Sequence, residues 1–283
     1  MSLPAAGENA RRQAPLGRRA LRIASVSTHG AYVVLSAEDP GGPEPLPGQF
    51  YMLAAHERWG GGAGERPVLP RAFSVLRAHA GPPQRLDFML EVVGPGTERL
   101  CELREGDGLY VLGPLGQGFT APHDGRRALL AGGGVGTAPL AMLQDALLAG
   151  GTPAPALLGF RDAAHAPGAE LLDGARVATD DGSVGHHGLV TDLLSGELDE
   201  DPHAVVYACG PPGMLEAVRA LCREREVPAQ LALESGMACG YGACFGCVVP
   251  LRGGGNLRLC VDGPVLDADR LETCLLPGHG GHG

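Results

Sequence analysis

The chain contains no lysine, and all 22 of its basic residues are arginine. A lysine Schiff base and the lysine of a P-loop are therefore excluded. Positive charge is also scarce, because 32 acidic residues give a formal net charge of −10 at pH 7. This balance argues against nucleic acid as the main partner. No uncharged run is longer than residues 128–144, which contain three consecutive glycines and fall short of the ~20 apolar residues of a membrane span. We therefore expect no nucleic acid and no membrane among the partners.

A secretory signal is also missing from the sequence. Arginine pairs stand at 11–12 and 18–19, but no apolar segment follows them. We therefore expect a cytoplasmic protein whose eight cysteines stay reduced. Cysteines in such a protein more often ligate metals, react as thiols or fill the core than form disulfides.

Glycine is the residue present in excess. The 46 glycines and 24 prolines border on the composition of low-complexity chains. Hydrophobic residues nevertheless make up 44% of the chain and charged residues only 19%, so it can bury a core. The glycines therefore need another explanation, and a close approach of the backbone to bound cofactors provides one.

The pattern over residues 19–124 predicts an antiparallel β-barrel. Short β-type runs separated by turn-rich segments are typical of such a domain. The expected strands are 21–23, 32–35, 49–53, 73–76, 86–93 and 108–112. We expect residues 1–18 to form a disordered tail and the glycine-rich loop 59–65 to be an insertion.

The pattern over residues 125–228 predicts a parallel α/β domain, because strands alternate with helices there. The expected strands are 128–131, 156–160, 175–179 and 204–208, and the expected helices are 137–149, 189–194 and 212–225. Residues 229–274 predict a small cysteine-rich subdomain, and residues 275–283 a flexible tail. The predicted fold class is thus multi-domain, a β-barrel followed by an α/β domain.

Four cysteines form the strongest motif, with the spacing C-x4-C-x2-C-x12-C: Cys239, Cys244, Cys247 and Cys260. The first three match the ligand spacing of plant-type [2Fe–2S] clusters, and the small residues between them let backbone N–H groups approach the sulfurs. A structural zinc site is one alternative, although zinc ribbons usually show two short cysteine pairs. Incidental cysteines are the other. Three further thiols belong to no pattern and are expected to be packing or surface residues: Cys101, Cys222 and Cys274.

A glycine-rich turn joins the first strand of the α/β domain to its first helix. Such a turn aims backbone N–H groups and a helix N-terminus at a phosphate. Tight packing of the strand against the helix is the alternative explanation. A second junction of this kind follows strand 204–208, and ligands gather at these strand ends in open α/β sheets. The candidate dinucleotide-binding residues of the two junctions are Gly133, Gly134, Val135, Gly136 and Thr137, and then Cys209, Gly210 and Pro211.

In the strand-rich half, Arg71-Ala72-Phe73-Ser74 combines side chains suited to a flavin nucleotide. The arginine guanidinium can form bidentate hydrogen bonds to a pyrophosphate. The phenylalanine can pack on a flat ring, and the serine hydroxyl can hydrogen-bond a ring nitrogen. A plain strand is the alternative, and the turn at 94–97 offers another site for an anion. After strand 156–160, Arg161 would favour a 2′-phosphorylated dinucleotide and Asp162 would oppose it. These residues leave NAD and NADP open.

In this order, the motifs resemble the ferredoxin–NAD(P)H reductase superfamily, and within it the family of dihydroorotate dehydrogenase B electron-transfer subunits. The resemblance covers about residues 19–272, and its segments are 71–74, 96–97, 112–116, 131–136, 179–183, 208–211, 237–247 and 260–265. Its most specific part is MACGYGACFGC at 237–247. Two features depart from the family pattern: Gly236, where a larger and often basic residue is usual, and the loop 59–65.

The resemblance implies FAD, a [2Fe–2S] cluster and NAD as cofactors. The cluster would be held by the four motif cysteines. Hydride and electron transfer would be carried by the cofactors, so we expect no catalytic side chain. Oxidation of dihydroorotate to orotate, in pyrimidine biosynthesis, would belong to an FMN-bearing catalytic partner subunit in a heterotetramer of two of each. The residues that would line FAD are Arg71, Ala72, Phe73, Ser74, Met89, Leu90, Glu91, Gly96 and Thr97.

Three alternatives remain open at this point. The chain could instead be the NAD(P)H-dependent reductase subunit of a hydrogenase, an oxygenase or a ferredoxin-reducing complex. It could be a redox-sensing adaptor that binds a nucleotide without turnover. It could also be a zinc-stabilised binding module, which would contain neither flavin nor iron.

Overall fold

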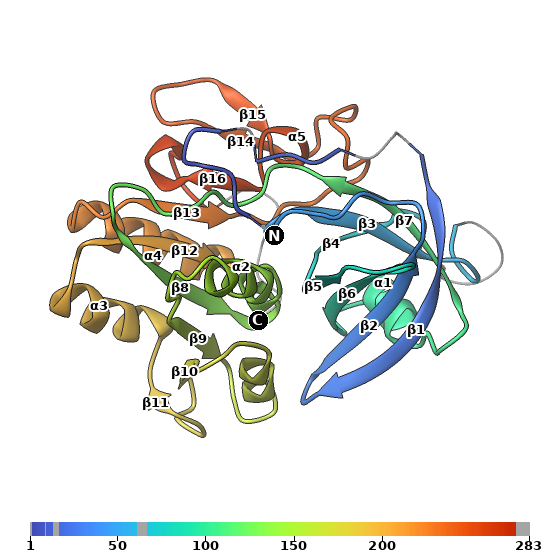
Figure 1. Cartoon of the computed structure of the whole chain (residues 1–283), viewed down its shortest axis with the longest axis horizontal. Helices are drawn as coiled ribbons and strands as arrows, with labels where there is room; N and C mark the ends of the chain where they lie inside the picture. Colours follow the sequence, from blue (N-terminus) through green and yellow to red (C-terminus); the bar gives the residue numbers. More distant parts are fainter. Residues whose placement is uncertain (1, 9, 14–16, 61–66, 276–283) are drawn as a thin grey trace.

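A computed structural model describes residues 2–8, 10–13, 17–60 and 67–275. Its first part is an antiparallel sheet with the strand order β4-β3-β7-β1-β2-β6-β5. Figure 1 shows this sheet curling around the helix α1 (Pro95–Cys101). The strands are β1 (Arg19–His29), β2 (Tyr32–Asp39), β3 (Phe50–Ala55), β4 (Arg71–Ser74), β5 (Arg77–His79), β6 (Gln84–Glu91) and β7 (Gly108–Leu115). The β-barrel predicted for residues 19–124 is thus confirmed, as a curled antiparallel sheet.

The second part is a sheet with the order β11-β10-β9-β8-β12-β13-β16, and all its neighbouring strands are parallel except the last pair. Its strands are β8 (Arg127–Gly133), β9 (Ala156–Phe160), β10 (Arg176–Thr179), β11 (His186–His187), β12 (Ala204–Cys209), β13 (Ala229–Ala232) and β16 (Val265–Asp267). Its helices are α2 (Thr137–Ala149), α3 (Val190–Glu200) and α4 (Pro212–Glu224). The predicted α/β domain is confirmed.

Residues along β8 show why helices cover both faces of this sheet. Successive side chains of a strand point to opposite faces, and those of β8 are almost all apolar. Leu129 belongs to the core that contains the helices α3 and α4. Its neighbour Leu130 belongs to the core that contains α2. A strand buried on both faces is typical of a parallel sheet between two helical layers.

The cysteine-rich segment is not separate from the α/β sheet, which differs from the boundary expected at residue 228. Its first strand, β13, pairs in parallel with β12, and its last strand, β16, pairs antiparallel with β13. The sheet edge at β13 is thereby covered by the returning chain. Between them lie the hairpin strands β14 (Val248–Pro250) and β15 (Asn256–Arg258) and the short helix α5 (Leu259–Asp262), above the sheets in Figure 1. Three 3₁₀ turns complete the described elements: Gly134–Gly136, Ala166–Leu171 and Ala268–Arg270.

The described part of the N-terminal segment differs from the disordered tail that we expected. Ala10 is buried, and its carbonyl oxygen accepts a hydrogen bond from the N–H of Gly118. Gln49 donates a side-chain hydrogen bond to the carbonyl of Arg12. Hydrogen bonds to the polar backbone of the link between β7 and β8 therefore hold this segment in place. Residues 61–66 of the expected insertion and 276–283 of the expected tail lie outside the described residues.

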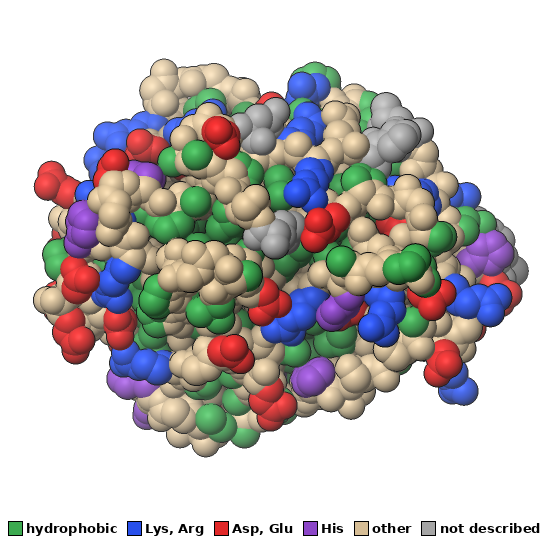
Figure 2. Space-filling view, viewed as in Figure 1, with side chains coloured by type: hydrophobic (Ala, Val, Ile, Leu, Met, Phe, Trp, Pro, Cys, Tyr) green, Lys and Arg blue, Asp and Glu red, His purple; other side chains and the backbone are tan. Residues whose placement is uncertain are grey.

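Charges of both signs are mixed over the face shown in Figure 2. Within the described ranges, no helix combines the length and the apolar character needed to span a membrane.

Candidate functional site

The two predicted strand–helix junctions lie side by side. β8 and β12 are neighbours in the sheet, and Gly132 pairs with Cys209. A Cβ on Gly136 would lie 2.5 Å from the carbonyl carbon of Cys209 and 2.6 Å from the N of Gly210. A Cβ on Gly133 would lie 2.7 Å from Met214 Sδ. These glycines are therefore needed for close packing of the two junctions, which supports the packing explanation at these positions.

Gly134 has a different role in the same turn. A Cβ there would meet only open space and the Tyr32 hydroxyl at 3.9 Å, but its φ of +53° is strained for other residues. Thr137, at the start of α2, is buried, and its hydroxyl has no hydrogen-bond partner among the residues described. The turn lies between β9 and β12, where the strand order reverses, and ligands bind at such points. A dinucleotide site at this turn remains a prediction.

Sequence reasoning missed Glu234, two residues beyond β13. Its side chain is exposed to solvent. Burial raises the pKa of the Cys209 thiol well above its usual value, and the nearby Glu234 carboxylate raises it further. The carboxyl ends of β12 and β13 therefore bring a thiol and a carboxyl group close together. Reading Ala229–Ala232 as a strand of the sheet would have pointed to this residue.

On the barrel, Arg71, Ala72, Phe73 and Ser74 form β4, and all four are half-buried. The Arg71 guanidinium lies against the start of α1, so that a Cβ on Gly96 would come within 2.7 Å of Arg71 Cζ. Arg71 Nη1 donates a hydrogen bond to the carbonyl of Leu69 at 2.6 Å. A guanidinium beside a glycine turn is a suitable cradle for a pyrophosphate, so these residues fit the FAD that the resemblance implies.

Other residues expected to line FAD use their side chains for structure. Met89 and Leu90 are buried in two different cores. The Thr97 hydroxyl accepts hydrogen bonds from the N–H groups of Val93 and Gly94 and thus holds the turn before α1. β5 pairs with β6 only at residues 85–87 of β6. What β6 can offer a flavin at residues 89–90 is therefore its backbone edge.

Three of the motif cysteines lie in the loop before β14, and Cys260 lies in α5; the four form two pairs. The Cys260 N–H donates to Cys247 Sγ at 3.4 Å, and the Cys247 thiol helps burial to raise the pKa of Cys260 to about 12. Burial also acts to raise the pKa of Cys239, but hydrogen bonds from loop N–H groups and from the Cys244 thiol outweigh it and lower the pKa to about 6. A thiolate is the form that ligates iron. Two pairs of cysteines match the two irons of a [2Fe–2S] cluster.

The glycines of this loop bring its backbone against its surroundings. Gly240 has a φ of +79°, and a Cβ there would lie 2.6 Å from Met52 Cγ on β3. Gly242 has a φ of +87°, and a Cβ there would lie 2.7 Å from Val261 Cγ2. These contacts place the loop backbone against β3 and α5, and within the loop the N–H of Gly246 donates to Cys244 Sγ at 3.5 Å, as expected where backbone surrounds a cluster. In the parts of the chain that the structure describes, no three His, Cys, Asp or Glu side chains are arranged around a single metal ion.

The space around Gly236 is open, so the unusual glycine does not disturb the packing of the cluster loop.

One side of the cluster loop contacts the barrel, and the other faces solvent. Met52, which touches Gly240, pairs with Ala72 of β4, so the loop reaches the strand that carries Arg71–Ser74. On the outer side Cys244 is exposed, and the exposed fractions of the Tyr241 and Phe245 side chains are 49% and 62%. The loop therefore connects the predicted flavin strand with the surface.

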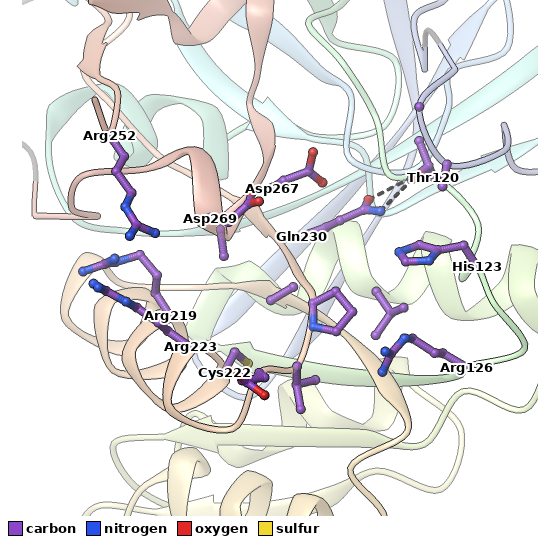
Figure 3. A pocket seen from close by; sticks show the side chains of 18 residues that line it. Thr120, His123, Arg126, Arg219, Cys222, Arg223, Gln230, Arg252, Asp267 and Asp269 are labelled. Carbon is purple, nitrogen blue, oxygen red and sulfur yellow. Dashed lines mark hydrogen bonds between the residues drawn. The ribbon is translucent and has the colours of Figure 1, made fainter. Parts of the chain in front are cut away.

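A separate cavity of about 560 Å³ lies at the amino ends of β12 and β13. Figure 3 shows three arginines on one side of it, Arg219 and Arg223 from α4 and Arg252 from the hairpin, with Asp267 and Asp269 to their right. The junction glycines and the motif cysteines lie elsewhere, because the cofactor motifs are at the carboxyl ends of the strands. This cavity is therefore not the site that the motifs predict.

Known proteins resemble both the cysteine-rich segment and the whole chain. The family model for the iron–sulfur cluster binding domain of dihydroorotate dehydrogenase B matches residues 234–272. The dihydroorotate dehydrogenase B (NAD(+)) electron transfer subunit of Desulforamulus reducens is 36% identical over 231 residues, which cover 78% of this chain and 84% of the relative. The chain belongs to the family of dihydroorotate dehydrogenase B electron-transfer subunits. The subunit of Caldanaerobacter subterraneus subsp. tengcongensis is 37% identical, with 81% and 88% covered.

Solved structures agree with this family. A chain of the NADH-dependent reduced ferredoxin–NADP oxidoreductase has a TM-score of 0.76 and 27% identity, covering 89% of this chain and 90% of that chain. Phthalate dioxygenase reductase has a TM-score of 0.60 at 17% identity, covering 91% and 96%, and shows the shared fold. The predicted family, the fold and the set of FAD, [2Fe–2S] and NAD cofactors are thereby confirmed. The individual residues predicted to contact FAD and NAD remain predictions.

Proposed function

We propose that this subunit passes electrons between NAD and a partner subunit that oxidises dihydroorotate to orotate. The relatives at 36–37% identity are electron transfer subunits of dihydroorotate dehydrogenase B. Oxidation of dihydroorotate releases two electrons and two protons, and NAD⁺ takes up both electrons and one proton. FAD, when bound, exchanges a hydride with NAD and single electrons with the cluster.

The observation that carries this proposal is the position of the cluster loop. Gly240 contacts Met52 beside the predicted flavin strand, while Cys244 lies on the opposite, exposed side. Electrons that enter at the surface can therefore reach the flavin through one short segment of protein.

The residues of this chain would bind and orient the cofactors. Arg71 would pair with the FAD pyrophosphate, and Cys239, Cys244, Cys247 and Cys260 would ligate the iron atoms. The backbone at Gly134 and the start of α2 would face the phosphates of NAD.

The exposed aromatic side chains beside Cys244 are the proposed contact with the partner. Aromatic residues supply much of the binding energy at protein interfaces. Phe245 has a left-handed φ of +57° and lies 5.2 Å from the Arg258 guanidinium, which holds it outward. We further propose that the partner bears FMN, that two copies of each subunit assemble, and that the complex works in the cytoplasm.

The test is anaerobic purification of the chain with and without a dihydroorotate-oxidising subunit. We expect flavin and [2Fe–2S] absorbance in this chain, and NAD-linked dihydroorotate oxidation only in the complex. Phe245→Asp should prevent assembly but leave NADH-driven dye reduction by the isolated subunit intact. Leu148→Asp, which changes another exposed apolar side chain on α2, should affect neither. A colourless protein, or assembly that tolerates Phe245→Asp, would contradict the proposal.

A second candidate is electron exchange with ferredoxin. It is favoured by the similarity to the NADH-dependent reduced ferredoxin–NADP oxidoreductase, with a TM-score of 0.76. Rapid reduction of ferredoxin by NADH, without any dihydroorotate-oxidising subunit bound, would support this candidate instead.

A further inference from the structure

An arginine of the α/β domain is held by a carboxylate of the barrel. Arg161 follows β9, and its Nη2 donates to Glu91 Oε1 on β6 at 2.6 Å. The same nitrogen donates to His165 Nε2, also at 2.6 Å. The Glu91 side chain is 19% exposed and the Arg161 side chain 57% exposed, so the pair lies at the rim of the site, with the carboxylate as its sheltered partner. The charge of Arg161 is thus already balanced by Glu91.

The neighbouring Asp162 is held as an anion with one oxygen left over. Its Oδ1 accepts hydrogen bonds from the N–H groups of Ala164 and His165 and from His165 Nδ1, at 2.9, 3.2 and 2.6 Å. The hydrogen bond from the His165 ring is the main cause of a lowered Asp162 pKa. All three bonds go to Oδ1, and the side chain is 41% exposed. Oδ2 therefore remains available to a ligand.

We infer that Glu91 sets the preference for NAD over NADP by withholding Arg161 from a 2′-phosphate. β9 pairs with β8 beside the glycine-rich turn, with Gly159 opposite Gly133. The adenosine ribose of a dinucleotide lies at this strand end in doubly wound sheets. Asp162 Oδ2 accepts the ribose 2′-hydroxyl of NAD and repels the 2′-phosphate of NADP. The guanidinium that could compensate this repulsion is paired with Glu91.

This inference rests on the proposed function, in which NAD is the dinucleotide. Its test compares wild type with Glu91→Gln, Arg161→Gln and the double variant, all as full chains reconstituted with FAD and the cluster. The first measurement is the ratio of kcat/KM for NADPH to kcat/KM for NADH in ferricyanide reduction. The second is the binding of adenosine 2′,5′-bisphosphate against adenosine 5′-monophosphate by calorimetry, which needs neither flavin nor turnover.

Glu91→Gln should raise the NADPH-to-NADH ratio about tenfold, the size expected of one charged hydrogen bond to a phosphate. It should tighten binding of the bisphosphate, but not of the monophosphate, by a similar factor. The double variant should lose both gains, because the freed guanidinium is gone. Asp145→Asn is the matched control, since it removes another ion pair between the two domains, Arg77–Asp145; it should leave the ratio unchanged.

Two results would overturn the inference: a Glu91→Gln ratio like that of wild type, or a gain that survives in the double variant. If Glu91→Gln weakens the binding of FAD, the calorimetric comparison of the two adenosine phosphates still tests the role of Glu91. Failure of the proposed function would appear differently, as absence of NADH oxidation in wild type whatever the bisphosphate binding shows.

Discussion

Replacement of Gly136 by alanine tests whether the two strand–helix junctions are packed as tightly as the structure indicates. The new Cβ would lie 2.5 Å from the carbonyl carbon of Cys209, about 0.9 Å closer than ordinary contact, which begins at 3.4 Å. The φ of Gly136 is −62°, so alanine suits the local backbone and the whole cost is steric. The atoms that it meets are backbone of the neighbouring junction and cannot rotate away.

Overpacking of this kind costs about 1–3 kcal/mol, and we expect the upper end because β8 and β12 would have to separate. At about 2–4 °C per kcal/mol for a chain of this size, the Tm should fall by about 6–12 °C. The assay is thermal denaturation followed by circular dichroism, at matched flavin content.

Gly196→Ala is the matched control. Gly196 lies within α3, and nothing is within 4 Å of the position of a Cβ. Alanine should stabilise that helix by up to about 1 kcal/mol. A Gly136→Ala variant whose Tm equals or exceeds that of wild type would refute the close packing of the junctions.

Three further outcomes follow from individual contacts. Hydrogen bonds from Arg219 and from the C-terminal segment hold the pKa of Glu216 at about 2, against 4.5 ordinarily. Because the folded pKa is lowered, this stabilisation is complete above pH 4.5 and is lost as the pH falls towards 2. Allowing for partial exposure, urea denaturation of Glu216→Gln should show a loss of about 1–2 kcal/mol at pH 7 that narrows at pH 3; a constant difference would contradict this. Arg71→Gln should weaken FAD binding at least about tenfold by flavin fluorescence, and unchanged affinity would remove Arg71 from the flavin site. Cys244→Ser should lose the cluster absorbance, whereas Cys222→Ser, at a buried thiol outside the motif, should keep it; equal spectra would exclude Cys244 as a ligand.

The sequence determined the features that depend on neighbours along the chain. The spacing of Cys239, Cys244 and Cys247 specified a cluster loop, because ligands that close together can meet without help from the rest of the fold. The two strand–turn–helix junctions were likewise predictable, since their glycine and proline punctuation is local. Alternation of strands and helices was enough to predict a parallel sheet.

The tertiary structure decided what depends on residues far apart in the sequence. β13 and β16 joined the α/β sheet because a strand edge needs hydrogen-bond partners, whichever domain the composition suggests. The described N-terminal residues packed against the link between the sheets for the same reason. Glu234 came close to Cys209 only because β12 and β13 are adjacent. The contact of the Glu91 side chain with Arg161 is set by how two domains meet, and no local pattern encodes it.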